Sequence, residues 1–409
     1  MKAIFTLLII STLILWVSCE TEPIEKETPK INLTRKSAEI IEADHAFGFE
    51  LFKEICRISE EENIMISPMS VSYALGMTYN GAAGSTLDAF NEVLHFGGLT
   101  NQEVNESYKD LMDQLLNLSE EVDFALANSI WFKEGYPVLE EFIRTNEDYF
   151  NAAIREADFS DPKTVDLING WIEEQTNDKI KDMLDQIPDD VIMYLINAIY
   201  FNADWKYEFP KEDTYKGDFY LENESKTAVD YMVVDGDFQY TLMDDFTAVE
   251  LPYSDSSFSM VVMLPHLESS ISSLTESLDV STWDSWFEHS QRLGVRVVLP
   301  KFKYEFKDLL NDPLLTLGLG VAFSDLADFS RIVPDRKLCI SRVIHQTFID
   351  VQEEGTEAAA ATIVEIKELS SAGGSFISFR ADHPFLYLIK ENSTGATVFM
   401  GKVGRPMYE

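Results

Sequence analysis

The most regular pattern in the first part of the chain is helical. From Ser37 to Ile58 apolar residues recur at spacings of three, four and seven, which predicts one buried face of a long helix. Residues 63–86 predict a short strand, a helix that begins at a Ser-Pro pair (Ser67-Pro68), and a stop at an Asn-Gly pair. A third amphipathic helix is predicted over residues 164–180.

Strand patterns separate these helices and dominate the last third of the chain. Residues 123–132 and 191–201 are almost continuously apolar, as expected for strands that are covered on both faces. Several shorter apolar runs follow after residue 257, divided by Gly, Pro and Ser. Because there is no regular alternation of strands and helices, we expect an α+β fold. There is no internal repeat, and residues 37–409 read as one domain.

One segment near the C-terminus, EEGTEAAAATIVEIKELSSAGGS (residues 353–375), has a pattern with two interpretations. As a strand it presents one wholly small or apolar face, whereas three charged residues lie on the opposite face: Glu357, Glu365 and Lys367. The run of four alanines instead favours a helix, although that helix would have no clear apolar stripe. Periodicity supports the two interpretations equally, and the SSAGGS that follows is typical of a flexible loop.

The charge balance excludes two classes of partner. The 409 residues contain 32 Lys and Arg against 71 Asp and Glu, so the formal net charge is 32 − 71 = −39. Such a surface repels phosphate backbones and anionic lipids. We therefore expect neither nucleic-acid binding nor polybasic docking to a membrane.

The N-terminus has the features of an export signal. Residues 1–18 combine one lysine with an apolar run that is short for a membrane span. Cys19 follows, and residues 19–36 are acidic and poor in apolar residues, which predicts a disordered tether. This order resembles a bacterial lipoprotein signal with Cys19 as the acylated residue, but Trp16 stands where a small aliphatic residue is usual. Lipid anchoring through Cys19 and ordinary secretion stay equally supported, and both place the protein outside the cytoplasm.

Patterns that would indicate an enzyme are missing from the sequence. There is no G-x-S-x-G, no His-Glu-x-x-His and no complete phosphate-binding loop, and the six histidines are scattered without metal-ligand spacing. Cys56 and Cys339 lack the spacing of a zinc or redox site. They are read either as buried thiols or as one disulfide. We expect no catalytic residues, no metal and no cofactor, although one carboxylate pair among so many leaves an unrecognised envelope enzyme as an alternative.

Four stretches together resemble one protein family. QTFIDVQEEGTEAAAAT is similar to the hinge of the serpins, the serine protease inhibitor family. NIMISPMSVSYALGMTYNGAAGST resembles their shutter helix, LINAIYFNADWKYEF their central strand and breach, and ADHPFLYLIKENSTGATVFMGKVGRP their C-terminal hairpin in the style of prokaryotic members. The stretches occur in the family's order and cover about residues 37–409.

The resemblance implies a fold and a mechanism. The fold has three β-sheets, eight or nine helices and an exposed reactive-centre loop. In the mechanism, a serine protease cuts this loop to a covalent acyl-enzyme, and the freed loop inserts into the central sheet and distorts the tethered protease, a behaviour that is known for serpins generally. The protein would thus be an irreversible, metastable inhibitor and no enzyme.

The same resemblance assigns the site residues. A reactive bond at Leu369-Ser370 follows from the family spacing of fifteen positions from Gly355, and a leucine there suits chymotrypsin-like or subtilisin-like proteases. Cleavage after Glu368 or Lys367 stays open, which would suit glutamyl endopeptidases or trypsin-like enzymes. The hinge residues are Glu353, Glu354, Gly355, Thr356, Glu357, Ala358, Ala359, Ala360, Ala361 and Thr362. The shutter and breach residues are Ser67, Ser70, Asn197, Trp205 and His345, and His345 is a structural residue in this assignment.

Partners follow from these assignments. We expect a target serine protease, a monomeric inhibitor, and no heparin-type activation, because residues 100–121 carry a single lysine among many acids. A non-inhibitory serpin that acts as a carrier, chaperone or surface interaction protein is the alternative. The hinge contains four consecutive alanines and no proline, which favours the inhibitory interpretation.

Overall fold

A computed structural model describes residues 28–189, 191–335, 337–356 and 376–408 of the chain. Within these ranges the helices are α1 (Arg35–Ile58), α2 (Pro68–Tyr79), α3 (Gly84–Val93), α4 (Asn101–Leu116), α5 (Glu140–Phe150), α6 (Lys163–Gln175), α7 (Ile271–Glu276), α8 (Val280–His289) and α9 (Asn311–Thr316). The strands are β1 (Asn63–Ile66), β2 (Val122–Lys133), β3 (Ala153–Ala157), β4 (Met193–Asp204), β5 (Tyr215–Tyr220), β6 (Lys226–Leu242), β7 (Phe246–Pro252), β8 (Phe258–Pro265), β9 (Gln291–Pro300), β10 (Phe302–Leu309), β11 (Ile344–Val351), β12 (Gly355–Thr356), β13 (Ile377–Arg380), β14 (Phe385–Glu391) and β15 (Thr397–Val403).

The three predicted helices are present, although the one predicted over residues 164–180 ends at Gln175. Helix α1 begins at Arg35 because the side chain of Thr34 accepts a hydrogen bond from the Ser37 N–H and caps the first turn. Helix α2 is capped in the same way by Ser67, and Pro68 occupies its first position, where a missing N–H costs nothing. The long opening helix and the Ser-Pro helix start are both confirmed.

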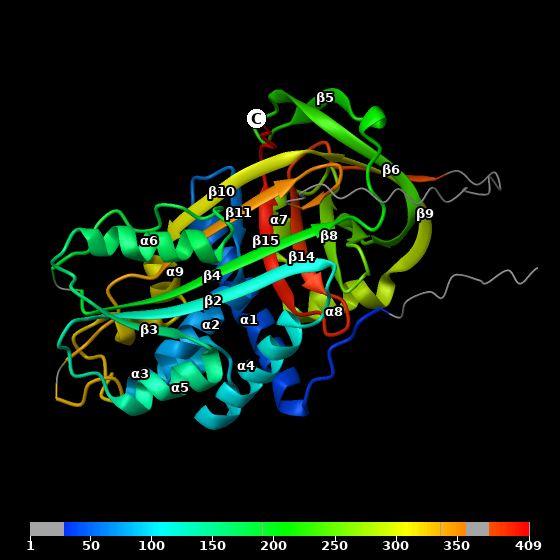
Figure 1. The fold of residues 1–409 in the computed structure, drawn as a ribbon. Coiled ribbons are helices and arrows are strands. Elements are labelled where there is room, and N and C mark those ends of the chain that lie inside the picture. Colours follow the sequence, from blue (N-terminus) through cyan, green and yellow to red (C-terminus); the bar gives the residue numbers. More distant parts are fainter. Residues whose placement is uncertain (1–27, 190, 336, 357–375, 409) are drawn as a thin grey trace, which may run out of the picture.

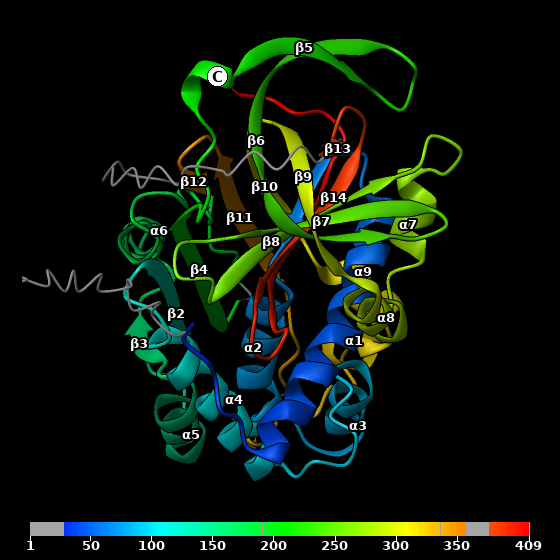
Figure 2. The ribbon, with the colours of Figure 1, turned by 90° about the vertical axis from the view of Figure 1, so that its right-hand side faces the viewer.

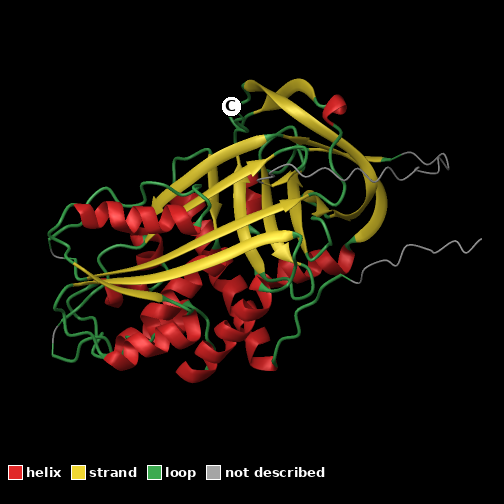
Figure 3. Ribbon diagram, viewed as in Figure 1, coloured by secondary structure: helices red, strands yellow, loops and turns green. Residues whose placement is uncertain are grey.

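A six-stranded sheet forms the centre of the molecule, with the strand order β10-β11-β12-β4-β2-β3. Helices α1 to α5 gather on one side of this sheet and α6 lies on the other, as Figures 1 and 3 show. Strands β2 and β4 are thus covered on both faces, which explains their continuous apolar runs. Under α6 a second apolar cluster forms around Trp131, Ile168 and Ile172.

A nine-stranded sheet packs behind the first, in the order β1-β15-β14-β8-β7-β6-β9-β13, with β5 added to β6. The family resemblance predicts three sheets, whereas the hydrogen bonds of the described strands join them into two. The reason is β6, whose 17 residues pair with β5 near one end and with β7 near the other, and with β9 between them. The α+β class and the expected number of helices are confirmed for the described residues.

The two sheets share one core. Helix α2 lies between them, and all of its residues except Ala74 are buried, so it has no face exposed to solvent. Figure 2 shows β5, β12 and the C-terminus at one end of the molecule and α3, α4 and α5 at the other.

The packed part of the chain begins before residue 37, where the sequence placed the domain boundary. Ile31 is buried at 6% exposure, and its N–H donates to the Ser393 hydroxyl at 2.9 Å. Ile31, six positions before Ser37, therefore packs against the domain. The tether predicted for residues 19–36 is shorter by these packed residues. Residues 1–27, including Cys19, lie outside the described residues.

Candidate functional site

One end of the six-stranded sheet holds the strand β12, of which the structure describes two residues. Gly355 and Thr356 form β12, which lies between β11 and β4 and is antiparallel to both. Thr356 pairs with Val351 on one side and Ala203 on the other, whereas Gly355 pairs with Asp204. Residues 357–375 follow directly and lie outside the described residues. The predicted hinge therefore enters the sheet between two of its inner strands, β11 and β4.

Glycine is the one residue type that fits at position 355. A Cβ atom on this residue would lie 2.3 Å from the Ala203 carbonyl oxygen and 2.7 Å from the Asp204 Cα. Both contacts are with backbone atoms of β4, which cannot move aside without breaking the ladder. Close approach of two backbones explains the glycine.

Thr356 is anchored by a buried pair of hydroxyl groups. It is 3% exposed, and its Oγ1 lies 2.6 Å from the hydroxyl oxygen of the fully buried Tyr253. The Tyr253 ring stacks on Trp205 with 4.5 Å between centroids and 10° between planes. Trp205 in turn donates its indole N–H to the Gln352 carbonyl at 2.9 Å. Stacking and hydrogen bonding thus hold the residues on both sides of the turn before β12.

Two glutamates of the hinge are held by lysines. The Glu353 side chain is 8% exposed, lies 2.8 Å from the Lys301 ammonium, and accepts a hydrogen bond from Thr214 at 2.9 Å. Burial acts to raise the pKa of the Glu353 carboxyl, but these hydrogen bonds bring it below its usual value, so the group is ionised. Glu354 forms an ion pair with the more exposed Lys211.

A second polar group lies under the sheet, at the start of α2. The Ser67 hydroxyl donates to the Val398 carbonyl at 2.7 Å and accepts from the Ser70 N–H at 3.2 Å. The Ser67 N–H donates to Nε2 of His345 at 3.1 Å. These bonds connect α2 with β15 of one sheet and β11 of the other.

From Ser70 the network continues across β4 to β2. The Ser70 hydroxyl donates to Oδ1 of Asn197, the Asn197 amide donates to Asn128 at 2.6 Å, and the Asn128 amide donates to the Phe150 carbonyl at 2.8 Å. Each buried side chain in this row has a partner, as buried polar groups require. The strands on either side of the predicted insertion line are therefore tied to the same helix.

His345 is neutral in this arrangement. It is buried, and burial lowers its pKa from 6.5 to about 4. Since Nε2 accepts a hydrogen bond, the proton of the neutral ring is on Nδ1. His345 is thus placed to hold the Ser67 backbone at the start of α2.

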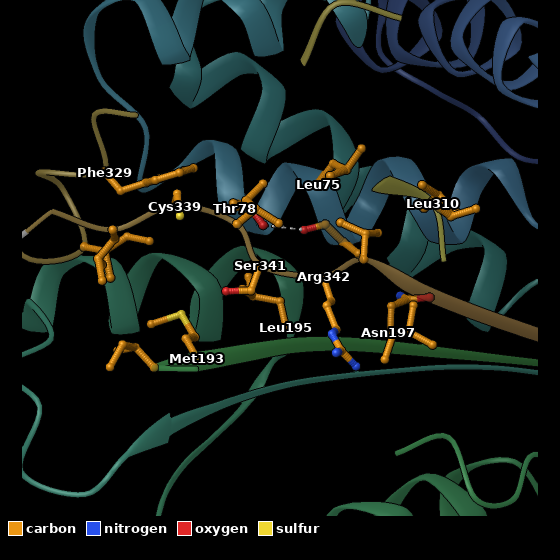
Figure 4. Close-up of a pocket in the computed structure, with 18 of the residues that line it drawn as sticks. Leu75, Thr78, Met193, Leu195, Asn197, Leu310, Phe329, Cys339, Ser341 and Arg342 are labelled. Carbon is orange, nitrogen blue, oxygen red and sulfur yellow. Dashed lines mark hydrogen bonds between the residues drawn. The ribbon is translucent and has the colours of Figure 1, made fainter. Parts of the chain in front are cut away.

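A cavity of about 330 Å³ adjoins this polar row (Figure 4). Helix α2, strand β4 and residues 337–345 enclose it, and Figure 4 shows apolar side chains such as Leu75 and Leu195 with polar ones such as Asn197 and Arg342 on its wall. Cys339 also lines the cavity and is exposed, whereas Cys56 is half-buried, and both are free thiols. The buried-thiol interpretation is wrong for Cys339, because residues 337–343 form no regular element and lie at the surface.

The predicted site residues fall into two groups. Ser67, Ser70, Asn197 and His345 meet under the sheet, whereas Trp205 lies with the hinge at the end of the sheet. Glu357 to Thr362, the three candidate cleavage positions and Ser370 lie outside the described residues. Sequence reasoning missed Tyr253, Lys301, Thr214 and Asn128, which occur in stretches without any motif and reach the site only through the fold.

The described residues form neither a metal site nor a membrane-spanning helix. In the described residues no three His, Cys, Asp or Glu side chains come together in a way that could hold a metal ion. No helix among them has the length and apolar character needed to cross a bilayer. The lysine of α4, Lys109, lies 3.4 Å from Asp113, so α4 offers no basic surface.

Comparison with known proteins agrees with the geometry. The family described as Serpin (serine protease inhibitor) matches residues 42–406. An uncharacterised serpin-like protein of Methanosarcina acetivorans is 37% identical over 90% of this chain and 88% of its own length. Human Serpin B4 is 32% identical over 89% of this chain and 99% of its own. The crystal structure of the thermophilic serpin tengpin in its native state superposes with a TM-score of 0.83 and 33% identity, covering 93% of this chain and 97% of that one.

Proposed function

Because this chain belongs to the serpin family, we propose that it is an irreversible suicide-substrate inhibitor of serine endopeptidases. The observation that supports this proposal is β12, the two-residue beginning of a strand between β11 and β4. The sequence that continues from it, EAAAAT, is composed mainly of side chains small enough to enter between two strands. The alternative, a non-inhibitory serpin, has no feature of the described residues in its favour.

The proposed trigger is cleavage at Leu369-Ser370. The hydroxyl oxygen of the protease serine attacks the Leu369 carbonyl carbon, and the peptide bond to Ser370 breaks. The Ser370 nitrogen takes up a proton and leaves as a new amino terminus. The Leu369 acyl group then remains as an ester on the protease, and only attack by water would release it.

Insertion of the freed segment competes with that hydrolysis. Each added residue would extend β12 and pair with both β11 and β4, which gives ladder hydrogen bonds that the intact loop cannot make. About fifteen residues at about 3.3 Å each would carry the ester about 50 Å along the sheet. The polar row from His345 to Asn128 would lie beneath this path and keep β11 and β4 aligned as they separate.

The experiment exposes the purified protein to chymotrypsin, subtilisin, trypsin and a glutamyl endopeptidase. We expect a covalent complex that survives denaturing gels with the first two enzymes, and a released C-terminal fragment that begins at Ser370. Leu369→Ala should strongly slow trapping of chymotrypsin, whereas the matched control Lys367→Ala should not. Clean cleavage near residue 369 by every protease, with none retained, would refute the inhibitory function.

The same gels test the choice of target class. A fragment that begins at Leu369 with the glutamyl endopeptidase, or at Glu368 with trypsin, together with a covalent complex, would move the reactive bond by one or two residues. The inhibitory function would then stand and the assignment of Leu369 would fall. The chain's export and any anchoring through Cys19 are separate proposals, tested by mass spectrometry of the protein isolated from its own cells.

A further inference from the structure

The C-terminal residues of the chain return to the hinge. After β15 the chain passes alongside β10, and the Lys303 N–H donates to the Met407 carbonyl at 2.7 Å. This contact places the next residue, Tyr408, over Lys301, with 4.2 Å between the ring centroid and the ammonium nitrogen. Lys301 is the residue that holds Glu353 at 2.8 Å. One ammonium group is therefore shared by an aromatic face and a hinge carboxylate.

The hydroxyl group of the same tyrosine reaches the hinge by a second route. It donates to Oε1 of Gln352 at 2.9 Å. Gln352 begins the turn into β12, because its N–H donates to the Gly355 carbonyl at 3.0 Å and its carbonyl accepts from Trp205 at 2.9 Å. Tyr408 thus touches the residue before Glu353 directly and Glu353 itself through Lys301.

We propose that Tyr408 is a positioning residue for loop insertion, which holds the turn of residues 352–355 closed so that a cut loop enters the sheet in register. The inference rests on the proposed inhibitory function. The paired residues Gly355 and Thr356 are where an added strand would begin, and its first steps are the costly ones, because order must be imposed before most of the contacts are made. A side chain that keeps this nucleus formed shortens the delay between cleavage and insertion.

The environment of Tyr408 suits this role. Lys301 is 16% exposed, so its attraction to the ring and to Glu353 is weakly screened. Burial, together with Asp350 and the hinge carboxylates, raises the pKa of the Tyr408 phenol well above its usual value, so the hydroxyl remains a donor to Gln352 at any physiological pH. Met407, by contrast, is 51% exposed and contributes its carbonyl rather than its side chain.

The test measures how each acyl-enzyme divides between trapping and release. Wild type, Tyr408→Ala, Tyr408→Phe and the control Met407→Ala are titrated against the protease that wild type traps best. Three quantities are recorded: the moles of inhibitor consumed per mole of protease inactivated, the rate of loop cleavage, and the thermal midpoint. We expect Tyr408→Ala to lower the ratio of trapped to released complexes about tenfold. Tyr408→Phe, which keeps the ring over Lys301 but loses the bond to Gln352, should lie between Ala and wild type.

The cleavage rate and the control separate a positioning role from general damage. Met407→Ala should have the same ratio of trapped to released complexes as wild type. All four proteins should be cleaved at the same rate, because the loop that the protease attacks is unchanged. If Tyr408→Ala does not fold, Tyr408→Phe carries the test alone. Equal ratios for wild type and the tyrosine variants would overturn the inference and leave the proposed function intact. A wild type that traps no protease would overturn the proposed function and the inference with it.

Discussion

The hydroxyl pair of Tyr253 and Thr356 offers the sharpest test of how β12 is held. The two oxygens lie 2.6 Å apart, and the residues are 0% and 3% exposed. Thr356→Val keeps the shape of the side chain but leaves the Tyr253 hydroxyl buried without this partner, which costs about 1–3 kcal/mol of unfolding free energy. Tyr253→Phe removes the other hydroxyl while its ring can still stack on Trp205.

A double-mutant cycle isolates the bond itself. We expect the double variant Tyr253→Phe/Thr356→Val to be more stable than the sum of the two single losses predicts, by about 1 kcal/mol, because neither hydroxyl is then left unpaired. Urea unfolding followed by fluorescence and circular dichroism gives the four free energies. Thr347 supplies a control, since its buried hydroxyl donates to the Met65 carbonyl at 2.9 Å and shares no partner with Tyr253. The losses of unfolding free energy for Tyr253→Phe and Thr347→Val should simply add. If the losses for Tyr253→Phe and Thr356→Val add equally well, the bond between the two hydroxyl groups does not hold β12.

Two further predictions follow from the hinge and from the residues beneath it. Thr356→Arg would place a charge at a buried position without a partner, which costs several kcal/mol. We expect denaturing gels to show this variant cleaved as a substrate with little covalent complex. An unchanged ratio of trapped to cleaved protein would contradict the role of Thr356. The pKa of His345 is about 4 in the fold and 6.5 when exposed, so its neutral form contributes stability that is complete above pH 6.5 and is lost as the pH falls to about 4, by about 3 kcal/mol. Between pH 7 and pH 4, urea unfolding of wild type should lose about 3 kcal/mol more free energy than that of His345→Gln. Parallel profiles would refute this, because Asp44, whose pKa burial raises to about 7, is present in both proteins.

The sequence predicted what depends on local pattern. The apolar spacing from Ser37 to Ile58 corresponds to α1, whose true start at Arg35 depends on the cap by Thr34. The Ser67-Pro68 pair corresponds to the start of α2, because an N-cap oxygen and a proline at the first position both favour that boundary. The strands predicted at residues 123–132 and 191–201 have boundaries within three residues of those of β2 and β4.

What the sequence could not predict depends on distant partners. The described part of β12, Gly355 and Thr356, is too short to show any periodicity, and it is identified as a strand only by its pairing with β11 and β4. The predicted second and third sheets are joined because β6 pairs with β5, β9 and β7 along its length, and these pairings depend on the tertiary fold. Tyr253 and Tyr408 belong to the site through contacts with residues about 100 and 56 positions away, and neither lies in a motif.

The place of β15 in the nine-stranded sheet has a consequence for synthesis of the protein. Strand β1, which ends at residue 66, pairs with β15, which ends at residue 403, so the two meet only after nearly the whole chain exists. Contacts of such long sequence separation slow folding, because the entropy of closing the loop is spent before the contacts form. A ribosome-bound chain would hold an unpaired strand beside α2 until its last residues emerged. We therefore expect partly made chains to need protection from association, and this sheet to close as one late event after release.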